Sequence, residues 1–159
     1  MTTTGAETLS FLKDGEVWIA DKDASSPIAI IRLASKQLVV ETWQKLGINQ
    51  KERFGFSFVV DDYEPRRYYG GNSPLRSLGG GFYPEYDLGI YCVTRDGYES
   101  NPWGLDSFNY VDITNIDYSG PFNIISGSFQ MRMTNVENEE CQDTIYITDG
   151  RFDLEFDVQ

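Results

Sequence analysis

Hydrophobic and polar residues alternate along the last third of the chain. In residues 129–134, Phe and Met occupy every second position, and in residues 151–158 Phe, Leu and Val do the same. Period-two alternation predicts half-buried β-strands. Because Asp-Gly is a preferred hairpin turn, we expect Asp149-Gly150 to turn the chain into the last of these strands.

Earlier segments show weaker versions of the same pattern. The expected strands before residue 145 are 8–12, 16–20, 27–34, 37–43, 53–60, 88–93, 108–117 and 124–134. Asp14-Gly15 predicts a tight turn between the first two of these strands. The pair 27–34 and 37–43 is apolar on both faces, which indicates a central position in the sheet. Residues 44–51 have room for one helical turn, which Gly47 would limit.

Two segments lack periodicity. Residues 61–87 contain Gly-Gly and Gly-Gly-Gly runs, prolines and six aromatic residues, and residues 95–107 include Pro102-Trp103. Such composition predicts irregular loops. We therefore expect an all-β fold, an antiparallel sandwich, with a flattened or lipocalin-like barrel as the alternative. The chain would form one domain over residues 8–159 after a flexible tether at 1–7.

Charge and composition exclude several functions. The chain of 159 residues has a net charge of −12, which argues against nucleic acid or an anionic lipid surface as a partner. No apolar run has transmembrane length. Histidine is absent, which removes the usual zinc ligand and the usual base of Ser-His and Cys-His enzymes. We therefore predict a protein that is not an enzyme and has no cofactor.

The two cysteines leave an alternative open. Cys92 and Cys141 would form one disulfide in an oxidising compartment, whereas in a reducing one they would be small buried hydrophobic residues. The choice depends on whether Met1 is the native start, which would favour the cytoplasm, or follows a removed signal.

Aromatic residues of the two irregular segments are the main candidates for a binding surface. Rings beside carboxylates and amides are what a glycan or peptide site requires, although the same rings would also cap the ends of a sandwich. The candidate residues are Tyr68, Tyr69, Phe82, Tyr83, Tyr86, Tyr98 and Trp103, with Tyr63 nearby.

Carboxylates supply weaker hypotheses. A calcium ion near Asp61, Asp62 and Glu64 is one hypothesis, although the spacing of an EF-hand is absent. A glycosidase-like pair of carboxyl groups would come from a larger set. That set is Asp61, Asp62, Glu64, Glu85 and Asp106. Two other groups, Asp153 with Glu155 and Asp157, and Glu137 with Glu139 and Glu140, are expected on solvated surfaces.

Two ends of the chain resemble a known group. Residues 4–8 followed by Asp14-Gly15-Glu16-Val17-Trp18, and residues 125–129 followed by 147–153, are similar to the opening and close of uncharacterised envelope lipoproteins of Bacteroidetes. The resemblance brackets the domain and leaves its middle unmatched. It implies a secreted, lipid-anchored, all-β domain of unknown function and supplies no catalytic residue. The cysteine that would carry the lipid is not in this sequence.

Together these observations predict a structural or binding module of the bacterial cell envelope. Its ligand would be a glycan or a peptide held by the loop aromatics. The alternatives are a carboxylate-dependent hydrolase and a barrel that carries an apolar ligand in an internal cavity.

Overall fold

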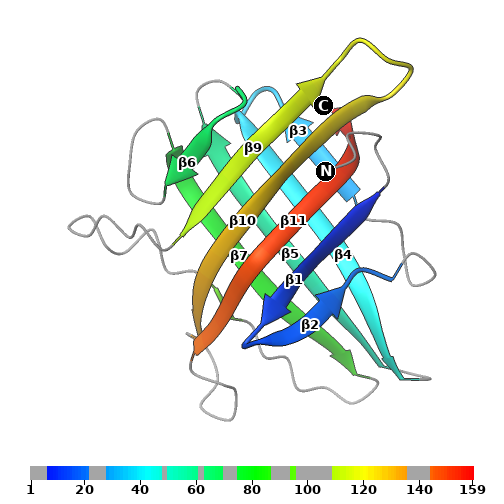
Figure 1. The fold of residues 1–159 in the computed structure, drawn as a ribbon, viewed down its shortest axis with the longest axis vertical. Coiled ribbons are helices and arrows are strands. Elements are labelled where there is room, and N and C mark those ends of the chain that lie inside the picture. Colours follow the sequence, from blue (N-terminus) through cyan, green and yellow to red (C-terminus); the bar gives the residue numbers. More distant parts are fainter. Residues whose placement is uncertain are drawn as a thin grey trace.

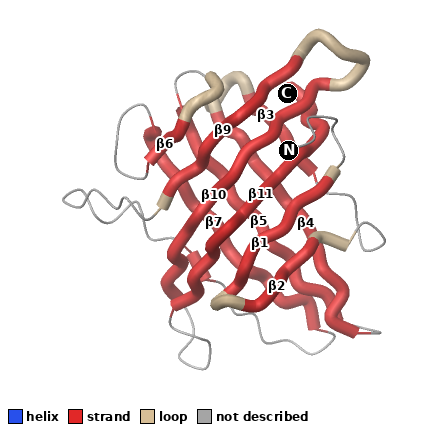
Figure 2. The backbone as a smooth tube through the Cα atoms, viewed as in Figure 1, coloured by secondary structure: helices blue, strands red, loops and turns tan. Residues whose placement is uncertain are grey.

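The protein folds almost entirely into β-strands. The computed structural model describes residues 7–21, 28–47, 50–60, 63–69, 75–86, 94–95, 109–135 and 144–159. The strands of this part are β1 (Thr8–Lys13), β2 (Glu16–Ile19), β3 (Ile28–Arg32), β4 (Gln37–Gly47), β5 (Gln50–Val60), β6 (Arg67–Tyr69), β7 (Leu75–Tyr86), β8 (Thr94–Arg95), β9 (Tyr110–Asp117), β10 (Asn123–Asn135) and β11 (Thr144–Val158). The described residues contain no helix (Figure 2), so the all-β prediction is confirmed.

The strands form one sheet that folds over on itself. Its order is β6-β9-β10-β11-β3-β4-β5-β7, with β1 and β2 added beside β11 and β8 beside β10. In Figure 1, β9, β10, β11 and β1 cross in front of β3, β4, β5 and β7. The two layers face each other as in a sandwich, but hydrogen bonds between β11 and β3 join them.

The junction between the layers is the one departure from antiparallel pairing among the described strands. β11 runs parallel to β3, with Phe156 opposite Ala29. Beyond the strand, Gln159 donates its N–H to the Ile31 carbonyl at 2.9 Å, which extends this pairing. In the described part of the chain the sheet does not close into a barrel.

Aromatic side chains fill the space between the layers. Phe11 of β1 stacks on Trp18 of β2, with ring centroids 4.7 Å apart, and Phe129 of β10 lies 4.9 Å from Phe56 of β5. Phe54 lies between these two pairs and stacks on Phe129. All five rings are buried. A carrier for an apolar ligand would need this space empty, so the interior gives no support to that alternative.

Several sequence predictions are confirmed in detail. β1 and β2 pair across Asp14-Gly15, where both residues have positive φ, as a tight hairpin turn requires. β3 and β4 pair antiparallel and lie in the middle of the sheet order. The expected strands 108–117 and 124–134 match β9 and β10 closely, and these two strands pair on either side of residues 118–122.

The prediction that Asp149-Gly150 turns the chain was wrong. These residues lie inside β11, which continues from residue 144 to residue 158. Between Ile147 and Gly150 of β11 there is one residue more than between the paired Met131 and Phe129 of β10. Asp149, at φ 52°, therefore forms a β-bulge. The strand that pairs with the end of β11 is β10, with Ile125 opposite Leu154.

Two further predictions about local structure were wrong. The described residues of the segment 44–51, which are 44–47 and 50–51, form no helical turn, because β4 continues to Gly47 and β5 begins at Gln50. Residues 61–87 are not a continuous irregular loop, because they include β6 and the 12-residue β7. β7 pairs along the length of β5, so glycines 79–81 lie in a strand. Of the second predicted loop, 95–107, only Arg95 is described, and the expected strand 88–93 and the acidic stretch 137–141 lie outside the described residues.

Candidate functional site

The predicted aromatic surface does not include Tyr68. This side chain is 1% exposed, and its hydroxyl donates to the Glu64 carbonyl at 2.9 Å and accepts from the Glu64 N–H at 2.8 Å. Pairing of β6 with β9 sets Tyr68 opposite Val111, itself a core residue. The alternative of rings that cap the sheet describes Tyr68 correctly. Tyr63 is half-buried, and its hydroxyl donates to the Lys36 carbonyl at 2.7 Å.

The other members of that predicted surface are only partly described. Tyr69 lies on β6, and the backbones of Phe82, Tyr83 and Tyr86 lie on β7. Tyr98 and Trp103 lie outside the described residues. The surface that these residues would form therefore stays a prediction.

The same holds for most of the predicted carboxylate sites. Asp61, Asp62 and Asp106 lie outside the described residues, as do Cys92 and Cys141. Glu64 is exposed at the turn that precedes β6, and Glu85 is on β7. Within the described ranges no group of three or more acidic or cysteine side chains is arranged to hold a metal ion.

A charged cluster lies inside one end of the fold. Glu52 on β5 follows the same alternation as Phe54 and Phe56, so its side chain points between the layers. Its carboxylate accepts from the Lys13 ammonium at 2.5 Å and from the Trp18 indole N–H at 2.8 Å. We call Lys13, Trp18 and Glu52 the Glu52 cluster. It ties the β1–β2 hairpin to β5 in the opposite layer.

Thr42 lies on the neighbouring strand β4 and is fully buried, opposite Phe54. Within the described structure its hydroxyl has no hydrogen-bond partner. The fold supplies hydrogen-bond donors to the Glu52 carboxylate, whereas among the described residues it supplies no partner to the Thr42 hydroxyl. An unpaired buried hydroxyl costs stability and adds no recognisable ligand site by itself.

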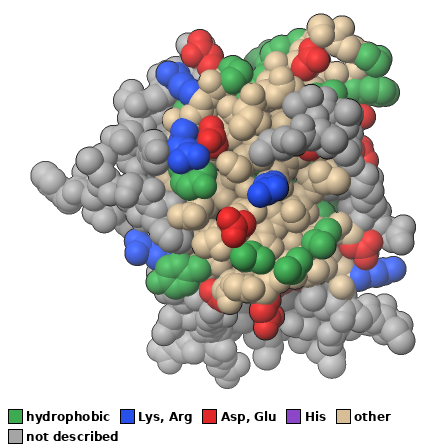
Figure 3. Space-filling model, in the orientation of Figure 1, with side chains coloured by type: hydrophobic (Ala, Val, Ile, Leu, Met, Phe, Trp, Pro, Cys, Tyr) green, Lys and Arg blue, Asp and Glu red, His purple; other side chains and the backbone are tan. Residues whose placement is uncertain are grey.

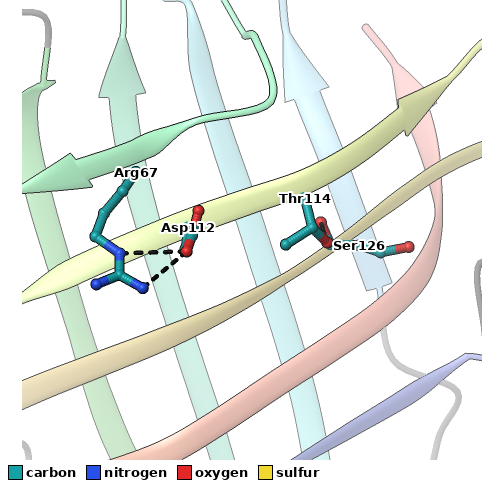
Figure 4. A network of polar contacts seen from close by, with 4 residues as sticks. All are labelled: Arg67, Asp112, Thr114 and Ser126. Carbon is teal, nitrogen blue, oxygen red and sulfur yellow. Dashed lines mark hydrogen bonds and ion pairs between the residues drawn. The ribbon is translucent and has the colours of Figure 1, made fainter. Parts of the chain in front are cut away.

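A second polar network runs across β6, β9, β10 and β11. Arg67 donates two hydrogen bonds to one Asp112 oxygen, and the Thr114 hydroxyl donates to the Ser126 carbonyl at 3.1 Å (Figure 4). The Ser126 hydroxyl in turn donates to Asp153 at 2.7 Å. Asp153 is buried, which corrects the expectation that it lies on a solvated face. Its cross-strand neighbour Ser126 supplies the hydrogen bond that permits this burial.

A hollow of about 290 Å³ lies at the C-terminal end of β11. It is formed where the end of β11 lies between β10 and β3, at the upper end of these strands in Figure 1. Its lining residues are Glu7, Ala29, Pro121, Phe122, Asn123, Glu155, Phe156 and Asp157. We call this site the acidic hollow.

The turn between β9 and β10 forms one wall of the acidic hollow. Asp117 accepts hydrogen bonds from the N–H and hydroxyl of Ser119, at 2.7 and 2.6 Å, which fixes the start of the turn and lowers the pKa of Asp117. Tyr118 packs edge-on against Phe156, with ring centroids 5.5 Å apart. Phe122, at the end of the turn, is 58% exposed. Figure 3 shows hydrophobic side chains gathered on this projecting turn.

The electrostatic character of the acidic hollow is one-sided. Three carboxylates, those of Glu7, Glu155 and Asp157, line it, and the described lining contains no lysine or arginine. Among the described residues no ion pair holds any of the three. Asn123 contributes an amide whose nitrogen lies 3.4 Å from the Phe156 carbonyl oxygen. The arrangement joins the exposed side chain of Phe122 to hydrogen-bond acceptors.

Sequence reasoning missed most of this site. Glu155 and Asp157 were expected, together with Asp153, on a solvated face, and Phe122 was not singled out. Nothing in the local pattern indicates that Glu7 and Ala29 lie beside them, because that neighbourhood depends on pairing between distant segments.

Comparisons add no identity to this description. No family model, no curated protein and no solved structure matches the chain. A helix of the length and apolarity needed to cross a membrane is also not found in the described ranges.

Proposed function

We propose that this protein is a non-catalytic binding module of the bacterial cell envelope, and that the acidic hollow holds a glycan or a peptide. The observation that carries the proposal is the hollow itself, where the exposed side chain of Phe122 lines the same site as three carboxylates that no ion pair among the described residues holds. Ligand sites combine apolar faces with a few polar groups that fix orientation. The envelope location rests on the resemblance of the two chain ends to envelope lipoproteins.

The hollow suits binding because its walls are held in place by the fold. Asn123, Glu155 and Phe156 lie on strands that pair with each other, and the Asp117–Ser119 hydrogen bonds hold the adjoining turn. A site with fixed walls binds without first ordering its side chains, which reduces the entropic cost. The absence of histidine supports the non-catalytic part of the proposal.

Backbone amide NMR during titration with a panel of oligosaccharides and short peptides tests the proposal. We expect a ligand to shift the amides of Asn123, Glu155 and Phe156. The variant Phe122→Ala should weaken binding, while Val17→Ala, which removes an exposed side chain on β2, should not. Shifts confined to other parts of the protein would contradict the site, and turnover of a bound ligand would contradict a non-catalytic role.

A separate experiment tests the location. The complete natural protein, expressed in its host with a labelled fatty acid, should carry the label and fractionate with membranes. A protein recovered without label in the cytoplasmic fraction would overturn the envelope assignment and leave the binding site to be judged by the titration.

A further inference from the structure

We propose that the acidic hollow binds the ammonium or guanidinium group of a lysine or arginine side chain carried by an extended peptide. This inference rests on the function proposed above and selects one ligand class for the same site. Its support comes from the hydrogen-bonding capacity, the exposed Phe122 side chain, the size and the charge of the hollow.

Hydrogen-bonding capacity distinguishes the ligand classes. The charged side chains of Glu7, Glu155 and Asp157 only accept hydrogen bonds when ionised. A sugar hydroxyl both donates and accepts, so a neutral sugar leaves part of its capacity unmet against such a lining. An ammonium has three donors and a guanidinium five, and neither has an acceptor. The lining therefore matches a cation better than a neutral sugar.

One aromatic side chain favours the same ligand class. Phe122, which is 58% exposed, lines the hollow together with the carboxylates, whereas the ring of Phe156 is buried in the core. A cation over an aromatic ring gains about 0.5–1 kcal/mol at an exposed site. This protein already uses that contact elsewhere, since the Arg67 guanidinium lies 4.3 Å from the ring centre of Tyr110 while it pairs with Asp112. The same two partners, a ring and a carboxylate, are presented in the hollow.

Size and charge point to a side chain carried by a longer ligand. At about 290 Å³ the hollow lies at the lower limit of the roughly 300–1,000 Å³ of small-molecule pockets. Its volume suits a single side chain of a longer ligand better than a whole oligosaccharide. With a net charge of −12, the protein attracts basic peptides from a distance. Charge complementarity therefore selects a basic peptide over the acidic or neutral alternatives.

Isothermal titration and amide NMR on the full chain test this inference with a matched pair of peptides. The first is a blocked Gly-Lys-Gly peptide, and the second is the same peptide with an acetylated lysine, which removes the charge. We expect the acetylated peptide to bind about three- to tenfold more weakly, and raising the salt concentration to weaken only the charged peptide. A Gly-Arg-Gly peptide should bind as the lysine peptide does.

Protein variants locate the charge effect. The double variant Glu155→Gln and Asp157→Asn should bind the lysine peptide about three- to tenfold more weakly, while leaving the acetylated peptide unchanged. Glu16→Gln removes an exposed carboxylate from β2 and is the control. Urea unfolding of each variant shows whether it is folded.

The outcomes separate this inference from the proposed function. A neutral glycan could shift the amides of Asn123 and Glu155 and bind more weakly to Phe122→Ala. If its affinity were also unchanged by salt and by the double variant, the cationic ligand would be refuted and the binding module would stand. If no ligand of either class shifts the hollow's amides, both fail. If n-butylamine binds as tightly as the lysine peptide, the peptide assignment is refuted.

Discussion

Removal of the Glu52 carboxylate should destabilise the fold more than removal of any exposed charge. The variant Glu52→Ala removes the acceptor that the Lys13 ammonium and the Trp18 indole N–H share. Trp18 is only 3% exposed, so its N–H cannot turn to water without moving the ring off Phe11.

The size of the effect follows from the exposure of each group. A buried donor without a partner costs about 1–3 kcal/mol, which applies to Trp18. Breaking a fully buried ion pair costs about 3–5 kcal/mol. The Lys13 side chain is 26% exposed and can reach solvent, so its share is smaller. We therefore expect Glu52→Ala to lower the free energy of unfolding by about 2–4 kcal/mol, and Glu52→Gln, which keeps an acceptor for Trp18, by about 1–2 kcal/mol.

Urea unfolding followed by tryptophan fluorescence and by circular dichroism measures these differences. The matched control is Asp112→Asn, which breaks the Arg67–Asp112 pair, whose side chains are 42% and 24% exposed. That substitution should cost less than about 1 kcal/mol. A double-mutant cycle with Lys13→Met should give a coupling energy with Glu52 of about 0.5–3 kcal/mol.

Two results would refute the reasoning. If Glu52→Ala cost no more than Asp112→Asn, the carboxylate would not be holding the two layers together. If the coupling between Lys13 and Glu52 were zero, the contribution of Glu52 would come from packing alone.

Three further predictions concern other parts of the fold. Gly127→Ala should lower the free energy of unfolding by about 1–3 kcal/mol or more, because the added Cβ would lie 2.2 Å from a backbone carbonyl oxygen of β9. The control is Gly120→Ala, whose added Cβ has its nearest contact at 3.5 Å. In the same urea experiment this control should change the free energy of unfolding by less than about 0.5 kcal/mol. Burial raises the pKa of Tyr63, so its contribution to stability is complete below about pH 10 and is lost as the pH rises above that value; Tyr63→Phe should reduce the loss of stability measured by urea unfolding between about pH 9 and pH 11. Ser119→Ala should raise the pKa of Asp117 toward its usual 3.8, which carboxyl NMR titration measures. The variant should also lack the stability that the wild type has above that pH and loses as the pH falls, which acid unfolding measures.

Sequence patterning was reliable where one strand could be read by itself. The alternation around Phe129 and Phe152 correctly placed both rings in the core, and Asp14-Gly15 correctly placed a turn. Sequence patterning was unreliable where the same local backbone conformation occurs in two different structures. A positive φ at the Asp of Asp-Gly occurs in a hairpin turn and also in a β-bulge. Only the pairing of the residues around Asp149 with β10 and β1, which leaves Asp149 itself without a partner in either register, distinguishes the two.

The position of Glu52 could have been predicted. It is two residues before Phe54, and strand alternation puts it on the same face as the core rings. The expected strand began at Arg53, three residues after the start of β5 at Gln50, and therefore left Glu52 out. The acidic hollow, in contrast, depends on the parallel pairing of β11 with β3, and no local pattern predicts which distant strand lies beside which.

Two carboxylates on one strand show how structural and ligand-binding roles are distinguished. Asp153 and Glu155 are two residues apart and share a strand face. Asp153 is buried and accepts a hydrogen bond from Ser126. Glu155 lines the hollow, and no ion pair among the described residues holds it. A buried acceptor that the fold already satisfies contributes to stability, and an acceptor that the fold leaves unpaired beside an aromatic ring is available to a ligand. Asp153→Asn should therefore change stability while Glu155→Gln changes binding. The reverse pattern would mean that the carboxylates of the hollow are structural and that the ligand, if held by this protein, lies elsewhere.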